Sequence, residues 1–187
     1  MRNWIYAGRA VAMLGLAVAG CSVARGPQAV GPAPPSEETK PVAVAPLAAQ
    51  EAELRAALAP TAAVVVRSPG ALELWYPVRL AFAPDSTELL PAGTAMLDLV
   101  AQSLRSYEHT AVVVAVYTDA IGSDDYNQRQ SESRAAVLVE ALKSRGVAPA
   151  RLTARGKGES AQLEAPNTAE GRDLNRRVQL IITPLSS

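Results

Sequence analysis

The chain has 187 residues, of which 49% are hydrophobic, and its 18 lysines and arginines equal its 18 aspartates and glutamates. This length and apolar content fit one folded domain with attached segments, and hardly two domains. The formal net charge of zero gives no global field that would draw the chain to nucleic acid or to an acidic membrane surface. The single cysteine, Cys21, excludes an intrachain disulfide and a metal site built from several thiolates.

The first 20 residues have the pattern of a secretory signal peptide. Arg2 and Arg9 make the start positive, and an apolar run over residues 10–19 follows. The run is shorter than the ~20 apolar residues that a membrane-spanning helix needs. The small residues before Cys21 resemble a bacterial lipobox, which implies that Cys21 carries lipid in the mature protein. Ser22 then implies sorting to the outer membrane, on its periplasmic face; an ordinary signal peptide with an incidental cysteine is the alternative.

Residues 21–62 differ in composition from the rest of the chain. They are rich in proline, alanine and small polar residues. Proline lacks a backbone donor, and small side chains offer little surface to bury. We therefore predict a tether from Cys21 to a folded domain over residues 63–187. Good helix formers at residues 51–58 indicate a short helix within that tether.

The first part of the predicted domain alternates between strand and helix signals. Residues 64–67 and 72–82 carry β-branched and aromatic residues around a Ser-Pro-Gly turn, which predicts a hairpin. Pro91 is suited to the first turn of a helix that ends near Tyr107. Its predicted apolar face is formed by Leu97, Val100, Ala101 and Leu104.

The second part continues the alternation. Residues 111–116 form a continuous apolar run, typical of a strand covered by helices, and we predict that it is the central strand. Gly146 is placed to end a following helix. We also expect a strand at 151–155, a short helix at 168–173 and a final strand at 177–183. The apolar face of the second long helix is predicted at Ala135, Leu138, Ala141 and Leu142.

Four short motifs occur in the C-terminal half. They are Tyr117-Thr118-Asp119, Asn127, Ser-Glu-Ser-Arg-Ala at 131–135, and Gly-Arg-Asp-Leu-Asn-Arg-Arg-Val at 171–178. Together they resemble the signature of the OmpA C-terminal domain family, also called OmpA-like peptidoglycan-binding domains, over roughly residues 80–183. The resemblance implies an α+β fold of the βαβαβ(α)β type. Such a fold is a two-layer sandwich with a mixed sheet and helices on one face.

The resemblance also implies a ligand. In that family an aspartate after a strand and an arginine on the next helix hold the diaminopimelate of the peptidoglycan stem peptide. Asp119 and Arg134 match these positions, at the family's spacing of 15 residues. A carboxylate can meet a ligand's ammonium group, and a guanidinium pairs two-fold with a carboxylate. The expected role is non-covalent peptidoglycan binding that ties membrane to wall, with no cofactor, metal or catalysis.

Further residues acquire expected roles from the same resemblance. Thr118 is expected to orient Asp119. Asn175 and Arg176 match the motif near the last strand, where Arg176 is the expected ligand neighbour and Arg177 the expected structural ion. Asn127 is expected to position the loop or to contact the ligand, and capping of the helix is the alternative.

The sequence leaves two alternatives to this interpretation. Asp119 and Arg134 could form an ion pair that pins the loop without a ligand. The domain could also serve as a scaffold within a larger envelope complex of secretion or motility, with protein partners.

The chain departs from the family pattern at two places. Gln130 stands where leucine is usual, and Val116-Tyr117 stand where Gly-His is usual. Tyr117 is therefore expected to keep an aromatic group at the site's rim.

An enzyme is not indicated by the sequence. The only histidine, His109, is expected in a surface loop, and no Ser-His pairing is suggested at the site. The adjacent Asp124 and Asp125 fit a helix N-terminus, where they complement the helix dipole. The glycines of Gly-Lys-Gly-Glu-Ser at 156–160 lack the spacing of a phosphate loop and are expected to let the chain turn.

Overall fold

A computed structural model describes residues 44–185, which lie in one compact unit. The predicted signal peptide at 1–20, Cys21 and the first half of the predicted tether lie outside the described residues. Five strands are present: β1 (Val64–Ser68), β2 (Ala71–Pro77), β3 (Thr110–Val116), β4 (Leu152–Gly156) and β5 (Arg177–Pro184). The α-helices are α1 (Val44–Leu58), α2 (Val78–Ala81), α3 (Pro91–Ser106), α4 (Asp124–Ser144) and α5 (Ala169–Asn175).

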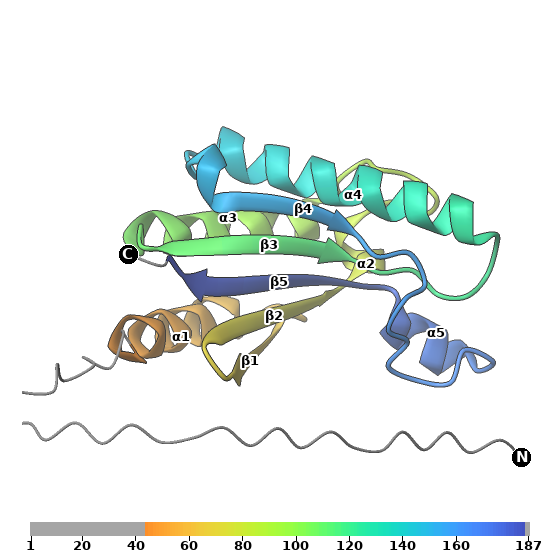
Figure 1. The fold of residues 1–187 in the computed structure, drawn as a ribbon, viewed down its shortest axis with the longest axis horizontal. Coiled ribbons are helices and arrows are strands. Elements are labelled where there is room, and N and C mark those ends of the chain that lie inside the picture. Colours follow the sequence, from red (N-terminus) through yellow and green to blue (C-terminus); the bar gives the residue numbers. More distant parts are fainter. Residues whose placement is uncertain (1–43, 186–187) are drawn as a thin grey trace, which may run out of the picture. The chain divides into compact units, whose positions relative to one another are not determined.

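The strands form one mixed sheet in the order β1-β2-β5-β3-β4 (Figure 1). β3 and β4 are parallel and are joined through α4, whereas the other neighbours are antiparallel. The predicted α+β fold with a mixed sheet is confirmed. The prediction that residues 111–116 form the central strand was wrong, because the chain returns at its end and inserts β5 between β2 and β3.

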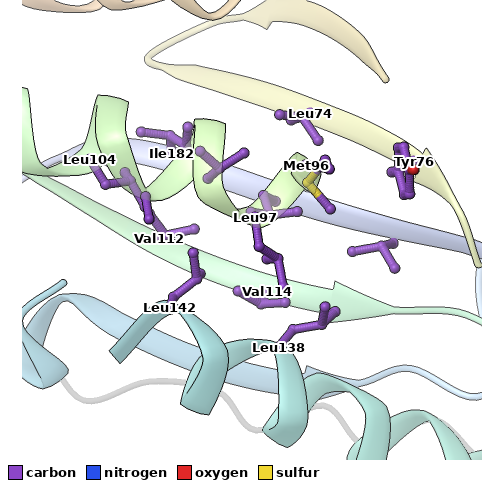
Figure 2. Close-up of a cluster of buried hydrophobic side chains, with 14 of the residues drawn as sticks. Leu74, Tyr76, Met96, Leu97, Leu104, Val112, Val114, Leu138, Leu142 and Ile182 are labelled. Atoms are coloured by element: carbon purple, nitrogen blue, oxygen red, sulfur yellow. The ribbon is translucent and has the colours of Figure 1, made fainter. Parts of the chain in front are cut away.

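The core lies between one face of the sheet and the three long helices. Strand residues alternate, so that Val112 and Val114 of β3 and Ile182 of β5 point into this layer with at most 1% of their surface exposed. Figure 2 shows leucines of α3 and α4 meeting them there. Each buried leucine contributes about 1.5–3 kcal/mol to stability. The predicted apolar faces of both long helices are confirmed.

The helix α1 begins before the predicted domain and is part of its core. Leu47, Leu54 and Leu58 are buried in the same apolar cluster as the sheet. The Glu51 carboxylate accepts from Arg67 of β1 at 2.8 Å, which also links α1 to the sheet. The tether predicted for residues 21–62 therefore does not extend through α1. The alanine-rich composition was misleading here, because alanine is also the best helix former and three leucines suffice to make one apolar face.

Close packing of α4 on β4 positions the loop that follows β3. A side chain at Gly156 would collide with the backbone nitrogen of Glu132 on α4. Gly158, with φ of +50°, donates its N–H to the Ser131 hydroxyl at 2.9 Å and accepts from the Thr118 N–H at 2.8 Å. The glycines at 156 and 158 thus allow the helix, the strand and the loop to pack closely. This packing accounts for the Gly-Lys-Gly-Glu-Ser sequence at 156–160 without a bound phosphate.

The place of α1 in the domain can be tested by truncating one of its buried side chains. We expect Leu54→Ala, at a site with 0% exposure, to lower the free energy of unfolding by about 2–5 kcal/mol, because it leaves a cavity. Leu185→Ala removes the same atoms from a residue that is 44% exposed and should cost less than about 1 kcal/mol. Chemical denaturation measures both. Equal, small effects would show that α1 is not part of the folded domain.

Candidate functional site

A cleft with a volume of about 460 Å³ opens at the C-terminal end of β3. Three segments line it, from α2 and the loop after it, from the loop after β3, and from the first half of α4; Arg176 completes it. Figure 1 shows α2 close to the end of β3. Among the sequence-predicted site residues, the cleft is lined by Thr118, Asp119, Asn127, Arg134 and Arg176. Asn175 is not among its lining residues.

Asp119 follows β3 and has only 11% of its side chain exposed. Its Oδ1 atom accepts the backbone N–H of Ile121 at 3.1 Å, which closes a local turn. Its Oδ2 atom accepts from Arg176 Nη1 at 2.5 Å. Because each carboxylate oxygen can accept more than one hydrogen bond, Asp119 retains acceptor capacity towards the cleft.

Arg134 presents its guanidinium to the cleft from α4, with 5% of the residue exposed. Nε donates to the Ser86 carbonyl at 2.9 Å, and Nη1 donates to Gln130 Oε1 at 3.1 Å. The guanidinium carbon lies 5.4 Å from the centre of the Phe82 ring, within the range of a cation–π interaction. Burial lowers the pKa of Arg134, and the charge of Asp85 only partly offsets that effect.

The guanidinium of Arg134 forms no ion pair among the described residues, and the charge of Asp85 offsets its burial only in part. An arginine has five N–H donors, and the two hydrogen bonds to Ser86 and Gln130 leave three without a protein acceptor in this part of the chain. A largely desolvated cation without a counterion costs free energy. The site is therefore electrostatically incomplete, and an anion in the cleft would complete it.

Asp119 and Arg134 do not form an ion pair with each other in the described structure. The partner of Asp119 is Arg176, whose Nη2 also donates to Asp173 at 3.0 Å. Asp173 in turn accepts from Arg79 at 2.8 Å. The ion pair that pins the loop after β3 thus connects it to the end of α5, and Arg134 stays unpaired.

The side chain of Asn127 holds the loop after β3, whereas the hydroxyl of Thr118 does not. Asn127 Nδ2 donates to the Asp119 carbonyl at 3.3 Å and to Glu159 at 3.0 Å, so its side chain positions the loop. It does not cap α4, because Ser123 is the capping residue. The Thr118 hydroxyl is buried, lines the cleft and has no hydrogen-bond partner, so no hydrogen bond orients Asp119 from there.

Asn175 and Arg177 act away from the cleft. Asn175 is completely buried, and its amide bonds the backbone of Leu163 and Glu164 over distances of 2.7–3.1 Å. The guanidinium carbon of Arg177 lies 3.7 Å from the centre of the Tyr117 ring. The expectation that Tyr117 lies at the rim of the site was wrong. Val112 and Val114 point to the helices, and alternation places Tyr117 on the other face of the sheet.

Sequence reasoning missed the partners of Arg134. In the sequence, Gln130 stands out only as a departure from the family pattern. Tyr126 belongs to none of the motifs. Both line the cleft with Arg134. The signal was present, because residues 126, 130 and 134 are spaced by four and must share one face of a helix. The Ser86 carbonyl could not have been found, since it depends on how the loop after α2 folds.

The described residues were also compared with the requirements of a membrane-spanning helix and of a metal site. Between residues 44 and 185, no helix is long and apolar enough to cross a membrane. In the same range, histidine, cysteine and acidic side chains do not gather in groups of three or more that could hold a metal ion.

A family model for the OmpA family matches residues 81–176, and the chain therefore belongs to that family. It is 39% identical over 134 residues to the probable lipoprotein YiaD of Escherichia coli, covering 72% of this chain and 61% of YiaD. It is 34% identical over 103 residues to the peptidoglycan-binding protein ArfA of Mycobacterium tuberculosis, covering 55% of this chain and 32% of ArfA. Both matches span less than two thirds of the relative's length.

The fold has a counterpart among solved structures. A putative MotB-like protein from Desulfovibrio vulgaris superposes with a TM-score of 0.67 at 25% sequence identity. The superposition covers 73% of this chain and 93% of that protein. The predicted architecture, a mixed sheet with helices on one face, is therefore shared with a protein of known structure.

The ion pairs around Asp173 predict a pH dependence of stability. The hydrogen bond from Arg79 lowers the pKa of Asp173 most, burial opposes it, and Arg176 adds to the lowering, so that the net pKa lies below its ordinary value. The carboxylate therefore stabilises the fold above pH ~4, and this contribution is lost as the pH falls through the lower folded-state pKa. Thermal unfolding should show a wild-type advantage over Asp173→Asn that is largest near neutral pH and shrinks below pH ~4.

The matched control is Glu164→Gln, at an exposed position whose side chain forms no ion pair among the described residues. It should show no comparable loss of a wild-type advantage over the same pH range. A difference between wild type and Asp173→Asn that stays constant from neutral to acidic pH would contradict the assignment.

Proposed function

We propose that this protein binds peptidoglycan non-covalently through the cleft, by recognising diaminopimelate in the stem peptide. Arg134 receives the carboxylate of that amino acid, and Asp119 receives its ammonium group. One observation carries the proposal: a largely buried guanidinium with unused donors faces the same cleft as a largely buried carboxylate. Binding requires no catalysis and no cofactor.

The charge balance of the cleft favours a zwitterion over a ligand with net charge. A ligand with only an ammonium group would leave Arg134 without an anion, and a ligand with only a carboxylate would leave the remaining acceptor capacity of Asp119 unused, because Arg176 already pairs with that carboxylate. The cleft is lined by Arg79, Arg134 and Arg176 and by Asp85 and Asp119, and Asp173, which lies outside the lining but pairs with Arg79 and Arg176, brings this group to three charges of each sign. A neutral ligand that carries both charges adds no net charge to this balance.

The expected affinity for a single stem peptide is modest. Hydrogen bonds to charged groups contribute about 1.5–3 kcal/mol each, and Arg176 already neutralises part of the Asp119 charge. Many copies on one wall would reinforce a weak individual grip. The name of one relative, the peptidoglycan-binding protein ArfA, supports the same ligand.

We further propose that lipid on Cys21 holds the protein on the periplasmic face of the outer membrane. The sequence pattern before Cys21 supports this attachment. The similarity to YiaD, a probable lipoprotein, supports it as well. With the membrane at one end and peptidoglycan at the other, the protein would tie the two layers together.

Retention on purified sacculi tests the proposed ligand contacts. With full-length protein in detergent, Arg134→Ala and Asp119→Asn should each weaken retention by about ten- to a hundredfold, because each removes one charge-assisted contact. Sedimentation with sacculi at a series of protein concentrations measures the effect. Circular dichroism establishes that each variant is folded.

The matched controls change the same residue types on exposed positions of α4. Arg129→Ala and Asp125→Asn should leave retention within about twofold of wild type, since neither residue lines the cleft. Unchanged retention of the folded Arg134→Ala and Asp119→Asn variants would refute the proposed recognition. Release of soluble muropeptides during the incubation would point to an enzyme instead.

A further inference from the structure

Three residues on successive turns of α4 form a hydrogen-bonded row along the cleft. Tyr126, Gln130 and Arg134 all line it. Arg134 Nη1 donates to Gln130 Oε1 at 3.1 Å, and Gln130 Nε2 donates to the Tyr126 hydroxyl oxygen at 3.0 Å. Tyr126 is 44% exposed, so its hydroxyl can reach a ligand. Gln130 is the link between the cation and the phenol.

The direction of these hydrogen bonds is fixed by chemistry. An arginine can only donate, so the atom of Gln130 that faces it must be the amide oxygen. The amide nitrogen of Gln130 then faces Tyr126 and occupies a lone pair of the hydroxyl oxygen. The hydroxyl proton of Tyr126 is left to donate elsewhere.

This side of the cleft consequently presents mainly donors to a ligand, and the oxygens nearest to Arg134 already accept one hydrogen bond each. The Gln130 and Ser86 oxygens already accept from Arg134. What remains for a ligand are N–H groups of Arg134 and the O–H of Tyr126 as donors, and the carboxylate of Asp85 as an acceptor. A carboxylate supplies two acceptor oxygens to such a surface, whereas a carboxamide brings N–H donors that would face donors without a partner.

Building on the proposed function, we infer that Gln130 makes the cleft selective for a free carboxyl group at the recognised end of diaminopimelate, against the same group as a carboxamide. Gln130 is a positioning residue, because it acts through Arg134 and Tyr126. Asp85 also lines the cleft and forms no ion pair with Arg134. Its carboxylate is the other acceptor on this side, so its contribution must be measured separately.

The selectivity can be measured with two synthetic probes. One is the stem tripeptide that ends in meso-diaminopimelate as the free acid, and the other is the same peptide with the side-chain carboxyl as a primary carboxamide. Isothermal titration of the full-length protein should give at least about tenfold tighter binding of the free acid, because an unpaired donor pair costs roughly that much.

Substitutions at Gln130 separate its role from the charge of Arg134. In Gln130→Glu the new carboxylate accepts from both Arg134 and Tyr126, which turns the Tyr126 oxygen towards the ligand as an acceptor. The acid-to-amide ratio of affinities should fall by about tenfold. Gln130→Met keeps the side-chain length but frees the Tyr126 oxygen, and should lower the ratio by at least threefold or so. In a Tyr126→Phe background, Gln130→Met should change the ratio less than in wild type, because only its contact with Arg134 is then lost.

The outcomes distinguish the inference from the function on which it rests. If folded wild type binds neither probe, diaminopimelate recognition fails and the inference fails with it. If wild type binds both probes equally, or if the Gln130 variants lower both affinities by the same factor, only the inference is overturned. The same holds if Asp85→Asn changes the ratio and the Gln130 variants do not.

Discussion

The site depends on one desolvated cation. The guanidinium of Arg134 is held by the Ser86 carbonyl and Gln130 and lies over the Phe82 ring, yet it forms no ion pair among the described residues, and Asp85 offsets its burial only in part. Burying this charge costs free energy of folding, because the unused N–H donors of Arg134 have no acceptor until a ligand binds. The close approach of α4 to β4 at Gly156 makes this placement possible, because it fixes the helix that carries the cation.

Asp119 differs from Arg134, because a side chain of opposite charge already holds it. Its carboxylate is held by the Ile121 N–H and by Arg176, and Asp173 holds Arg176 in turn. This network fixes the acceptor and at the same time reduces its charge. An aspartate without Arg176 would attract an ammonium group more strongly but would lack a fixed position. Under the proposed function, this arrangement suits reversible binding of a zwitterion that recurs many times along a polymer.

Most of the fold could be predicted from the sequence, and the exceptions have physical causes. The apolar faces at Leu97 and Leu138 follow from helical periodicity, which is local. The membership of α1 in the core depends on Leu54 meeting distant strands, and the central position of β5 depends on pairing across the whole chain. Resemblance identified Thr118, Asp119, Asn127, Arg134 and Arg176 of the cleft, but the roles of Tyr126 and Gln130 and the pairing of Asp119 with Arg176 required three-dimensional structure.

Side-chain ¹⁵N NMR of Arg134 during titration with the diaminopimelate tripeptide tests the central claim most directly. The account predicts that the Nε and Nη resonances of Arg134 shift in proportion to binding and that rotation of its guanidinium slows, because a carboxylate engages the unused donors. Saturable binding of the tripeptide with the Arg134 resonances unchanged would contradict it.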